Sequence, residues 1–450
     1  MSDSRAILVI DLAFGDCGKG TIIDFLARRT GARTVVRFNG GPQAGHNVVT
    51  PDGRHHTFSQ FGGATFVPGI RTLLSRFMLI EPYALFNEAR HLEQLGVGDA
   101  TDRLFIDARC LVITPAHQAA NRIRELARGG TAHGTCGMGV GETMADAIAH
   151  PELALRAEDL ANRATVRRRL RTVCELKRQQ LAEVLNSDQP SILPHARTIL
   201  EPTWVDAATE NYAALAERAT IIDSPAAAAM TREPGTILFE GAQGVLLDER
   251  YGFHPHTTWS TTTFANADCL LDEARYEGTR TRIGVLRTYF TRHGIGPLVT
   301  EEAALRSVLP EPHNEDAGWQ GQFRVGLFDA VAAGYAVEAA GGADWLAVTH
   351  VDRLPQLPRR ICTAYQVERP GASSGVPALI DRLPVHAAPS LEDRERLAAF
   401  CRACRPVYED VPGKGIDPML DRIARHTGIP IGITSTGPKA ADKRIEAAGL

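Results

Sequence analysis

Residues 6–21 combine a short apolar run with a loop in which three glycines surround a lysine. The apolar run, residues 7–12, predicts a strand buried on both faces, and the apolar spacing of residues 22–26 predicts a helix. A strand that turns through glycines into a helix N-terminus offers free backbone N–H groups and the positive end of the helix dipole. We therefore predict a phosphate site here, formed by Gly15, Gly18, Lys19, Gly20 and Thr21.

This loop differs from the ordinary P-loop. The pattern G-x-x-x-x-G-K-[ST] requires glycine at position 13 and Ser or Thr at position 20, where this chain has Ala13 and Gly20. Asp16 also lies inside the loop, where a bare carboxylate would repel a phosphate. An acid at this place needs a function, either in binding Mg²⁺ or in removing a proton. The alternative is a solvated carboxylate in a glycine-rich turn.

Further polar residues follow other short apolar segments. His46 ends a second glycine-rich loop, residues 39–47, and with Asp16 it forms a candidate acid–base pair for phosphoryl transfer to a weak nucleophile. Gln243 and Thr258 offer hydrogen bonds to a heterocycle. Asp352 follows a predicted strand, as does the carboxylate that recognises guanine in the N-K-x-D loops of GTP-binding proteins.

The elements that must position these residues alternate between strands and helices. We expect strands at residues 7–12, 33–38, 72–79, 104–113, 236–239, 283–290, 345–348 and 430–433, and helices at 83–95, 117–127 and within 153–185. Six glycines within residues 129–141 predict a loop that moves or closely approaches a ligand. Loops at the carboxyl ends of parallel strands converge on one cleft, so we predict a ligand site there.

The predicted fold is α/β, with a large, mostly parallel central sheet, flanking helices and a P-loop-like nucleotide-binding core. No internal repeat, low-complexity tract or clear linker divides the sequence. We therefore expect one catalytic domain over residues 1–450, with helical insertions at about residues 115–235.

Composition excludes several classes of protein. With 44% hydrophobic residues, 23% charged residues and a formal net charge of −4, the 450-residue chain can bury a large core and has no charge imbalance that indicates nucleic acid or membrane binding. It has neither a bilayer-length apolar run nor a signal-peptide pattern, so we expect a soluble cytoplasmic protein. Cys401 and Cys404 form a single C-x-x-C, which we interpret as a reduced pair on a helix.

Six motifs together resemble the adenylosuccinate synthetase family. The family's G-D-E-G-K-G and G-G-x-N-A-G-H correspond to residues 15–20 and 40–46. Its F-E-G-A-Q-G-x-L-L-D and T-R-x-G-x-G-P-x-x-T-E correspond to residues 239–248 and 291–301, and its T-K-x-D and S-T-G-P to residues 349–352 and 435–438. The motifs occur in the family's order and extend almost from end to end of the chain.

The resemblance implies a two-step ligase. Asp16 would remove the N1 proton of a 6-oxopurine nucleotide while Mg²⁺ and Lys19 hold GTP, and His46 would donate a hydrogen bond as the 6-oxygen attacks the γ-phosphoryl group. The amine of aspartate would then displace phosphate from C6. The implied metal ligands are Asp16 and the Gly45 carbonyl, and the family forms homodimers with shared sites. The resemblance implies that GTP is bound by Asp352, Ser435, Gly437 and Pro438. It implies that the acceptor or the amino acid is bound by Gln43, Thr135, Cys136, Gly137, His150, Thr258 and Arg324. Gln243 is among the implied catalytic residues.

Departures from the family pattern lie on the acceptor and amine side. Gln43 replaces an asparagine that touches the acceptor, Cys136 replaces a threonine, and His150 stands where an arginine reaches the partner subunit's acceptor phosphate. Arg324 alone survives of three arginines in the aspartate loop, and His350 replaces a lysine that stacks on guanine. Losing an arginine fork costs on the order of 2–5 kcal/mol, unless other cations (Arg287, Arg292 or Lys439) compensate.

Several functions stay open for such a divergent member. It is expected to form adenylosuccinate from IMP, or to act on dGMP or GMP like the phage 2-aminoadenylosuccinate synthetases, which typically lack the loop acid that this chain has as Asp16. A paralogue of secondary metabolism with another acceptor or amine is a further alternative. A non-catalytic nucleotide-binding regulator would need neither Asp16 nor His46. The sequence leaves open GTP against ATP, the oligomeric state and the role of Cys401 and Cys404.

Overall fold

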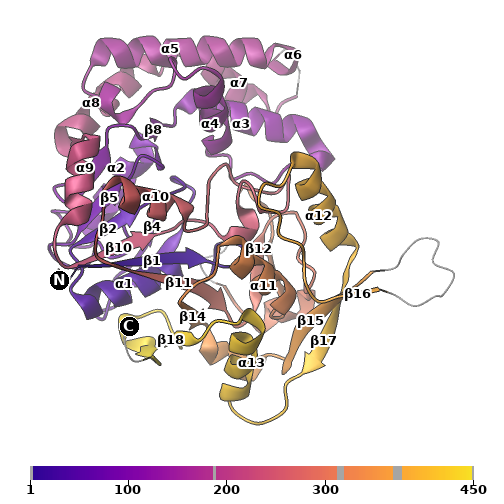
Figure 1. Cartoon of the computed structure of the whole chain (residues 1–450). Helices are drawn as coiled ribbons and strands as arrows, with labels where there is room; N and C mark the ends of the chain where they lie inside the picture. The colour runs from indigo at the N-terminus through magenta and orange to yellow at the C-terminus, as the bar shows by residue number, and fades with distance from the viewer. Residues whose placement is uncertain (1–3, 186–188, 312–318, 368–377, 448–450) are drawn as a thin grey trace.

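The fold is built on one ten-stranded sheet (Figure 1). The computed structural model describes residues 4–185, 189–311, 319–367 and 378–447. The strand order is β19-β18-β14-β11-β1-β10-β2-β5-β7-β9, and neighbouring strands are parallel except β19, which runs antiparallel to β18. The prediction of an α/β fold with a large, mostly parallel sheet is confirmed.

The first strand occupies the middle of the sheet. Its residues 6–10 are fully buried, as an apolar strand covered on both faces should be. It pairs with β10 on one side and β11 on the other, so segments more than two hundred residues away in the sequence flank the first loop. The strands of the sheet are β1 (Arg5–Asp11), β2 (Thr34–Arg37), β5 (Arg71–Leu74), β7 (Leu104–Asp107), β9 (Thr220–Ile222), β10 (Thr236–Glu240), β11 (Thr279–Arg287), β14 (Trp345–Thr349), β18 (Ile431–Ser435) and β19 (Lys443–Ile445).

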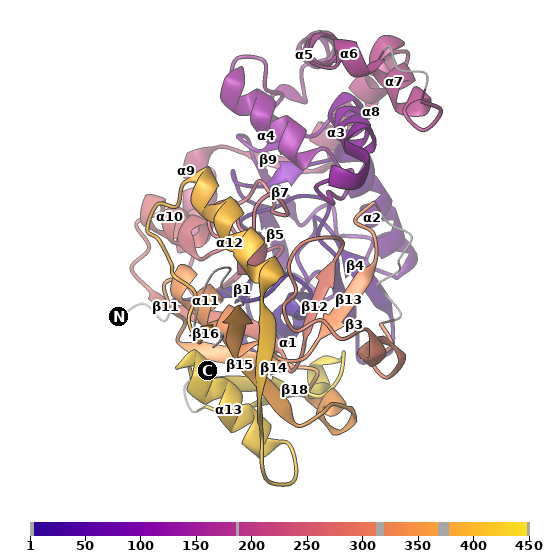
Figure 2. The same cartoon turned by 90° about the vertical axis from the view of Figure 1, so that its right-hand side faces the viewer.

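Helices cover the sheet and form a cap at one end of the molecule. In both views α5 to α8 lie at the top, with α3 and α4 close beneath them (Figures 1 and 2). The helices are α1 (Lys19–Thr30), α2 (Pro82–Gln94), α3 (Pro115–Arg128), α4 (Val140–Ala149), α5 (Arg163–Gln180), α6 (Ala182–Leu185), α7 (Leu193–Leu200), α8 (Val205–Arg218), α9 (Ser224–Arg232), α10 (Ala265–Glu273), α11 (Ala330–Ala339), α12 (Leu391–Ala403) and α13 (Asp417–Thr427). The interpretation of this cap as an insertion in a single catalytic domain stays a prediction.

Four small sheets complete the fold, and they correct three strand predictions. The smaller strands are β3 (His46–Val49) with β4 (His55–Phe58), β6 (Leu79–Ile80) with β8 (Leu111–Val112), β12 (Phe290–His293) with β13 (Phe323–Gly326), and β15 (Arg360–Val367) with β16 (Ala378–Ile380) and β17 (Arg405–Asp410). The predicted strand at 283–290 leaves the main sheet after Arg287, because Phe290 pairs with Gly326 in a separate hairpin. The predicted strands at 72–79 and 104–113 each divide into two, whose second parts pair with one another as β6 and β8.

Two other expectations concern cysteines and membranes. All eight cysteines are free, and Cys401 lies buried in α12 while Cys404 follows the helix end. Among the described residues, no helix is both long enough and apolar enough to cross a bilayer.

Candidate active site

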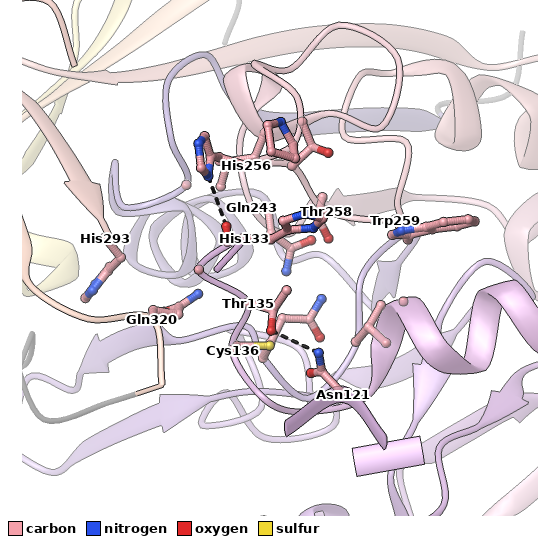
Figure 3. Close-up of a pocket in the computed structure, with 18 of the residues that line it drawn as sticks. Asn121, His133, Thr135, Cys136, Gln243, His256, Thr258, Trp259, His293 and Gln320 are labelled. Carbon is pink, nitrogen blue, oxygen red and sulfur yellow. Dashed lines mark hydrogen bonds between the residues drawn. The ribbon is translucent and has the colours of Figure 1, made fainter. Parts of the chain in front are cut away.

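A cavity of about 780 Å³ lies beside the first loop (Figure 3). Loops that follow β1 and β10, the loop before β3, the glycine-rich loop before α4, residues 254–259 and the β12 hairpin contribute to its wall. The predicted site residues that line it are Gly15, Asp16, Gln43, Gly45, His46, Thr135, Cys136, Gln243 and Thr258. Residues from these loops and from helices α3, α4 and α5 therefore meet at one cavity.

The first loop is shaped by a carboxylate that sequence reasoning missed. Asp11 Oδ1 accepts hydrogen bonds from the backbone N–H groups of Ala13 (2.8 Å) and Gly15 (3.1 Å), and Oδ2 accepts one from Cys17 N (2.8 Å). Lys19 Nζ lies 3.2 Å from Asp11 Oδ2 and donates to the Gly15 carbonyl at 2.7 Å. The sequence feature that could have indicated Asp11 is its position as an acidic residue at the end of an apolar strand.

Gly20 allows His46 to approach α1. A Cβ at position 20 would lie 2.7 Å from His46 Cβ, closer than such atoms pack. The Ser or Thr of an ordinary P-loop therefore has no room here, which explains the departure at Gly20 in steric terms. The histidine occupies the space instead and faces the cavity.

His46 is held by Glu240, a second residue that the sequence analysis did not single out. His46 Nδ1 lies 2.6 Å from Glu240 Oε1, and Gly63 N donates to Glu240 Oε2 at 2.8 Å. Burial lowers the pKa of His46 to about 4, although the Glu240 carboxylate favours the protonated ring. Glu240 ends β10 directly before the Gly-Ala-Gln-Gly loop, and that position was the signal for it.

Asp16 faces the cavity within a mixed charge environment. Burial raises its pKa, while His293 and Arg287 lower it. His293 Nε2 lies 3.7 Å from Asp16 Oδ2, and Arg287 donates through Nε to the Asp16 backbone carbonyl. His293 is a further residue that the sequence analysis did not select.

Asp16 and Gly45 fit the ligand set that Mg²⁺ takes beside a nucleotide. Both line the cavity, where a carboxylate and a carbonyl oxygen can join phosphate oxygens and water around the ion. Among the described residues, no group of three or more His, Cys, Asp or Glu side chains could hold a metal by itself.

Two carboxamides in the cavity lack protein partners. The side-chain nitrogen and oxygen atoms of Gln43 and Gln243 are buried and make no hydrogen bond. Gln243 also adopts a left-handed backbone conformation, with φ of 56°. Buried amides normally find a partner, so these two indicate a polar ligand.

The glycine-rich loop at 129–141 is tied to α3. Glu125 Oε2 accepts from Gly134 N at 2.9 Å and from Thr135 N at 3.1 Å, and Asn121 donates to Thr135 Oγ1 at 2.9 Å (Figure 3). Gly137 does not line the cavity: its carbonyl accepts from Arg122, and a Cβ there would meet Trp319 at 2.9 Å. The loop brings Thr135 and Cys136 to the cavity, and its approach to a ligand stays a prediction.

His150 and Arg324 lie away from the cavity. His150 caps the end of α4 on the surface, with Nδ1 4.0 Å from Glu152 Oε1. Arg324 pairs with Glu301 and donates to carbonyls of the β12 hairpin. Their roles in acceptor or amine binding stay predictions that the geometry of this chain alone does not support.

Of the three cations that could compensate for the missing arginines, one lines the cavity. This is Arg292, which is almost completely buried. Arg287 pairs with Glu311, and Lys439 donates to the Pro51 carbonyl at 3.3 Å. Gly318, the first residue of the shortened aspartate loop, lies outside the described residues.

The predicted nucleotide loops contact the first loop directly. Thr349 Oγ1 donates to the Cys17 carbonyl at 2.8 Å, and Thr21 Oγ1 donates to the Pro438 carbonyl at 2.6 Å. Ser435 Oγ donates to the Gly437 carbonyl at 3.1 Å, which closes the C-terminal loop. Burial raises the pKa of Asp352, which follows Thr349 in the same segment. These contacts place the first loop and the segment of residues 349–352 side by side, and the nucleotide-binding role of both stays a prediction.

Comparisons with known proteins agree with this arrangement. A family model described as adenylosuccinate synthetase matches residues 8–444. The chain is 30% identical over 447 residues to the adenylosuccinate synthetase of Mycobacterium tuberculosis (strain ATCC 25618 / H37Rv), covering 96% of each chain. It is 30% identical over 457 residues to that of Methylococcus capsulatus, covering 98% of this chain and 97% of the relative.

Two solved structures share the fold. The fully ligated adenylosuccinate synthetase of Plasmodium falciparum matches with a TM-score of 0.75 at 19% identity, over 98% of this chain and 99% of that one. The succinoaminodeoxyadenylate synthetase of cyanophage S-2L, bound to dGMP and dATP as an energy donor, matches with a TM-score of 0.61 at 19% identity, over 99% of this chain and 96% of that one.

Proposed function

This chain belongs to the adenylosuccinate synthetase family, and from that premise we propose that it is a GTP-dependent ligase that activates the 6-oxygen of a purine nucleotide and replaces it with the amine of aspartate. The observation that carries the proposal is that Asp16, His46 and Gln243, from three separate loops, line one cavity. IMP is the proposed acceptor and adenylosuccinate the proposed product.

The first step is deprotonation and phosphorylation of the acceptor. Asp16 takes the proton from N1, which moves negative charge to the 6-oxygen, and that oxygen attacks the γ-phosphorus of GTP with GDP leaving. The position of Asp16 at the cavity, together with the contacts of its loop to the nucleotide segments, supports this role. When bound, Mg²⁺ supplies charge neutralisation for the phosphates, with Asp16 and the Gly45 carbonyl as its protein ligands.

His46 is proposed to stabilise the transferring phosphoryl group. Its Nδ1 side is occupied by Glu240, so the Nε2 side remains for the cavity. The negative charge of a bound triphosphate would add to that of Glu240 and favour the protonated ring, which donates to a phosphoryl oxygen. Lys19, already placed in the loop by Asp11, provides the second cation.

The second step forms the C–N bond. The amine attacks C6 of the phosphorylated purine, and phosphate leaves with the former 6-oxygen. Gln243 and Gln43, whose amide groups lack protein partners, are proposed to orient the purine during this exchange. Thr135, Cys136 and Thr258 are proposed to bind the remainder of the acceptor, since all three line the cavity.

A different amine is the second candidate, and the geometry of Arg324 favours it. The guanidinium of Arg324 binds Glu301 and backbone carbonyls outside the cavity, so it is not placed to read an aspartate carboxylate. A 2-amino acceptor such as dGMP is less favoured, because this chain has Asp16 where the phage enzymes typically lack the loop acid. We propose that the phosphate donor is GTP and not ATP, because Asp352 stands where a carboxylate recognises guanine. We also propose that the protein forms a homodimer, which light scattering would measure.

A phosphate-release assay tests the proposal. Wild-type protein with Mg²⁺, GTP or ATP, and either aspartate or another amine receives IMP, dGMP or GMP one at a time, beside Asp16→Ala and the matched control Asp52→Ala on an exposed loop. We expect release with IMP and aspartate, lost in Asp16→Ala and kept in Asp52→Ala. Release that needs dGMP or GMP, or an amine other than aspartate, would identify the alternative substrates. GTP binding without release for any acceptor would indicate a regulator.

A further inference from the structure

Four consecutive carbonyls of the β12 hairpin, residues 294–297, accept hydrogen bonds from two arginines. Arg324 Nη1 donates to carbonyls 294 and 296, at 2.9 and 2.8 Å. Arg292 donates to the other two carbonyls, from Nε to carbonyl 295 at 3.3 Å and from Nη1 to carbonyl 297 at 3.1 Å. Every carbonyl of this short segment is therefore fixed by a guanidinium.

The two guanidinium groups differ in how their charge is balanced. Arg324 has the Glu301 carboxylate, with Nε 2.9 Å from Oε1. Arg292 is 1% exposed, lies 4.4 Å from the centre of the Phe14 ring and, within the described part of the chain, forms no ion pair. Burial, together with the positive charges of Arg324 and Arg402, lowers the pKa of Arg292 to about 9. Arg292 therefore relies on carbonyl oxygens for partners.

Arg292 also reaches two other parts of the cavity wall. Its Nη2 donates to the His256 backbone carbonyl at 3.2 Å. Arg402 Nη1 lies 3.0 Å from His256 Nε2, and because a guanidinium can only donate, the ring proton is on Nδ1. That proton is donated to the His133 carbonyl at 3.0 Å (Figure 3). One chain of hydrogen bonds thus joins the hairpin, residues 254–258 and the glycine-rich loop.

We propose that Arg292 and Arg324 are positioning residues that hold three loops of the cavity wall together, and that neither binds a substrate carboxylate. The proposal rests on the proposed function in taking this cavity as the acceptor and amine site. From the hairpin, the side chains of Arg292, His293 and Ile295 line the cavity, and Ile295 also packs against Gly134, where a Cβ would lie 3.1 Å from Ile295 Cγ1. The Nε, Nη1 and Nη2 groups of Arg292 already donate to backbone carbonyls of the hairpin and of residue 256, so its guanidinium joins these loops.

Hydrogen–deuterium exchange on the full chain tests the positioning role without any substrate. In Arg292→Gln, amide exchange should rise about tenfold or more in peptides covering residues 290–298, 253–259 and 130–139, and stay unchanged in β7, at residues 104–107. Arg360→Gln is the control, because Arg360 does not line the cavity and binds Glu302 instead of the three loops. A rise confined to residues 290–298 would overturn the linkage of the three loops. Arg292→Lys, which keeps the charge but loses the fork, should show the same pattern more weakly.

Amine kinetics test whether Arg324 reads a carboxylate. For Arg324→Gln, the KM for dicarboxylic, monocarboxylic and carboxylate-free amines should rise by the same factor, about tenfold, with the KM for GTP changed less than about twofold. A rise restricted to amines with a second carboxylate would contradict the proposal. Glu301→Gln adds an independent arm: releasing Arg324 from its partner should weaken amine binding, whereas a carboxylate reader would bind more tightly. If wild type is inactive with every acceptor, the proposed function fails while the exchange experiment still decides the positioning role.

Discussion

The Asp11 carboxylate and the Lys19 ammonium form an ion pair inside the first loop, with Oδ2 and Nζ 3.2 Å apart and both side chains fully buried. The same carboxylate accepts three backbone N–H groups, so it fixes both the loop conformation and the position of the cation. The lysine of this loop is therefore held in place by the protein itself.

Replacing Asp11 with asparagine should disrupt this loop. An asparagine amide N–H₂ in the place of Oδ2 would face Cys17 N–H and the Lys19 ammonium, which are themselves donors. Breaking a buried ion pair costs about 3–5 kcal/mol of folding stability. We expect a lower urea midpoint and weaker GTP binding, measured by denaturation and by calorimetric titration. Asp52→Asn, whose exposed carboxylate binds Arg54 at the surface, is the control and should change neither. Wild-type stability in Asp11→Asn would refute the role given to this pair.

Gly20 should not tolerate even a methyl group. Because a Cβ would meet His46 Cβ at 2.7 Å, Gly20→Ala must push the histidine away from α1 and lower both stability and turnover. Gly334→Ala is the matched change inside another helix, α11, where nothing lies within 4 Å. That variant should gain about 0.5–1 kcal/mol by helix propensity alone. Equal effects of the two substitutions would show that the contact with His46 has no consequence.

Stability should fall with acidity through His46. Burial lowers its folded-state pKa to about 4, below the ordinary value of 6.5, so the unfolded chain takes up this proton first. The stabilisation by the neutral ring is complete above about pH 6.5 and is lost progressively as the pH falls toward 4. Between about pH 7.5 and pH 5, wild type should lose about 2 kcal/mol more than His46→Gln, as measured from urea unfolding at both pH values. A parallel pH dependence of the two proteins would exclude a buried neutral histidine.

Gln243 should be dispensable for stability and required for turnover. Its buried amide atoms have no protein partner, so Gln243→Met removes no hydrogen bond and should leave the unfolding midpoint unchanged or higher while turnover falls. Gln60 provides the contrast: it is fully buried, donates to the Glu81 carbonyl at 3.1 Å and accepts from Glu81 N at 2.8 Å. Gln60→Met should cost about 1–3 kcal/mol. A Gln243→Met protein with normal turnover would contradict the ligand-facing role.

The sequence predicted the elements whose residues interact locally. The apolar run of β1, the glycine turn after it and the start of α1 follow from neighbouring residues, and the structure has them where the pattern placed them. The end of β11 could not be predicted in this way. Phe290 and its neighbours continue the apolar pattern, and only pairing with β13, more than thirty residues later, draws them into a hairpin.

The same distinction separates the site residues that were found from those that were missed. Asp16, His46 and Gln243 stand in glycine-rich loops and were predicted from that context. Glu240 was missed because its role depends on contact with His46, which is 194 residues away in the sequence. A carboxylate at the end of a strand is too common to indicate such a role by itself. Arg324 matched the aspartate-loop motif of the family. The direction in which its guanidinium points, however, is set by Glu301 and the hairpin carbonyls, and no local sequence pattern specifies these contacts.

The most direct test follows the 6-oxygen itself. An acceptor nucleotide labelled with ¹⁸O at C6 is converted with GTP, Mg²⁺ and the amine, and the released phosphate is analysed by mass spectrometry. If the 6-oxygen is phosphorylated and then displaced, one ¹⁸O atom appears in each phosphate molecule, at the rate of product formation. Unlabelled phosphate accompanied by product would contradict the account, because the oxygen would then have left without passing through a phosphoryl intermediate.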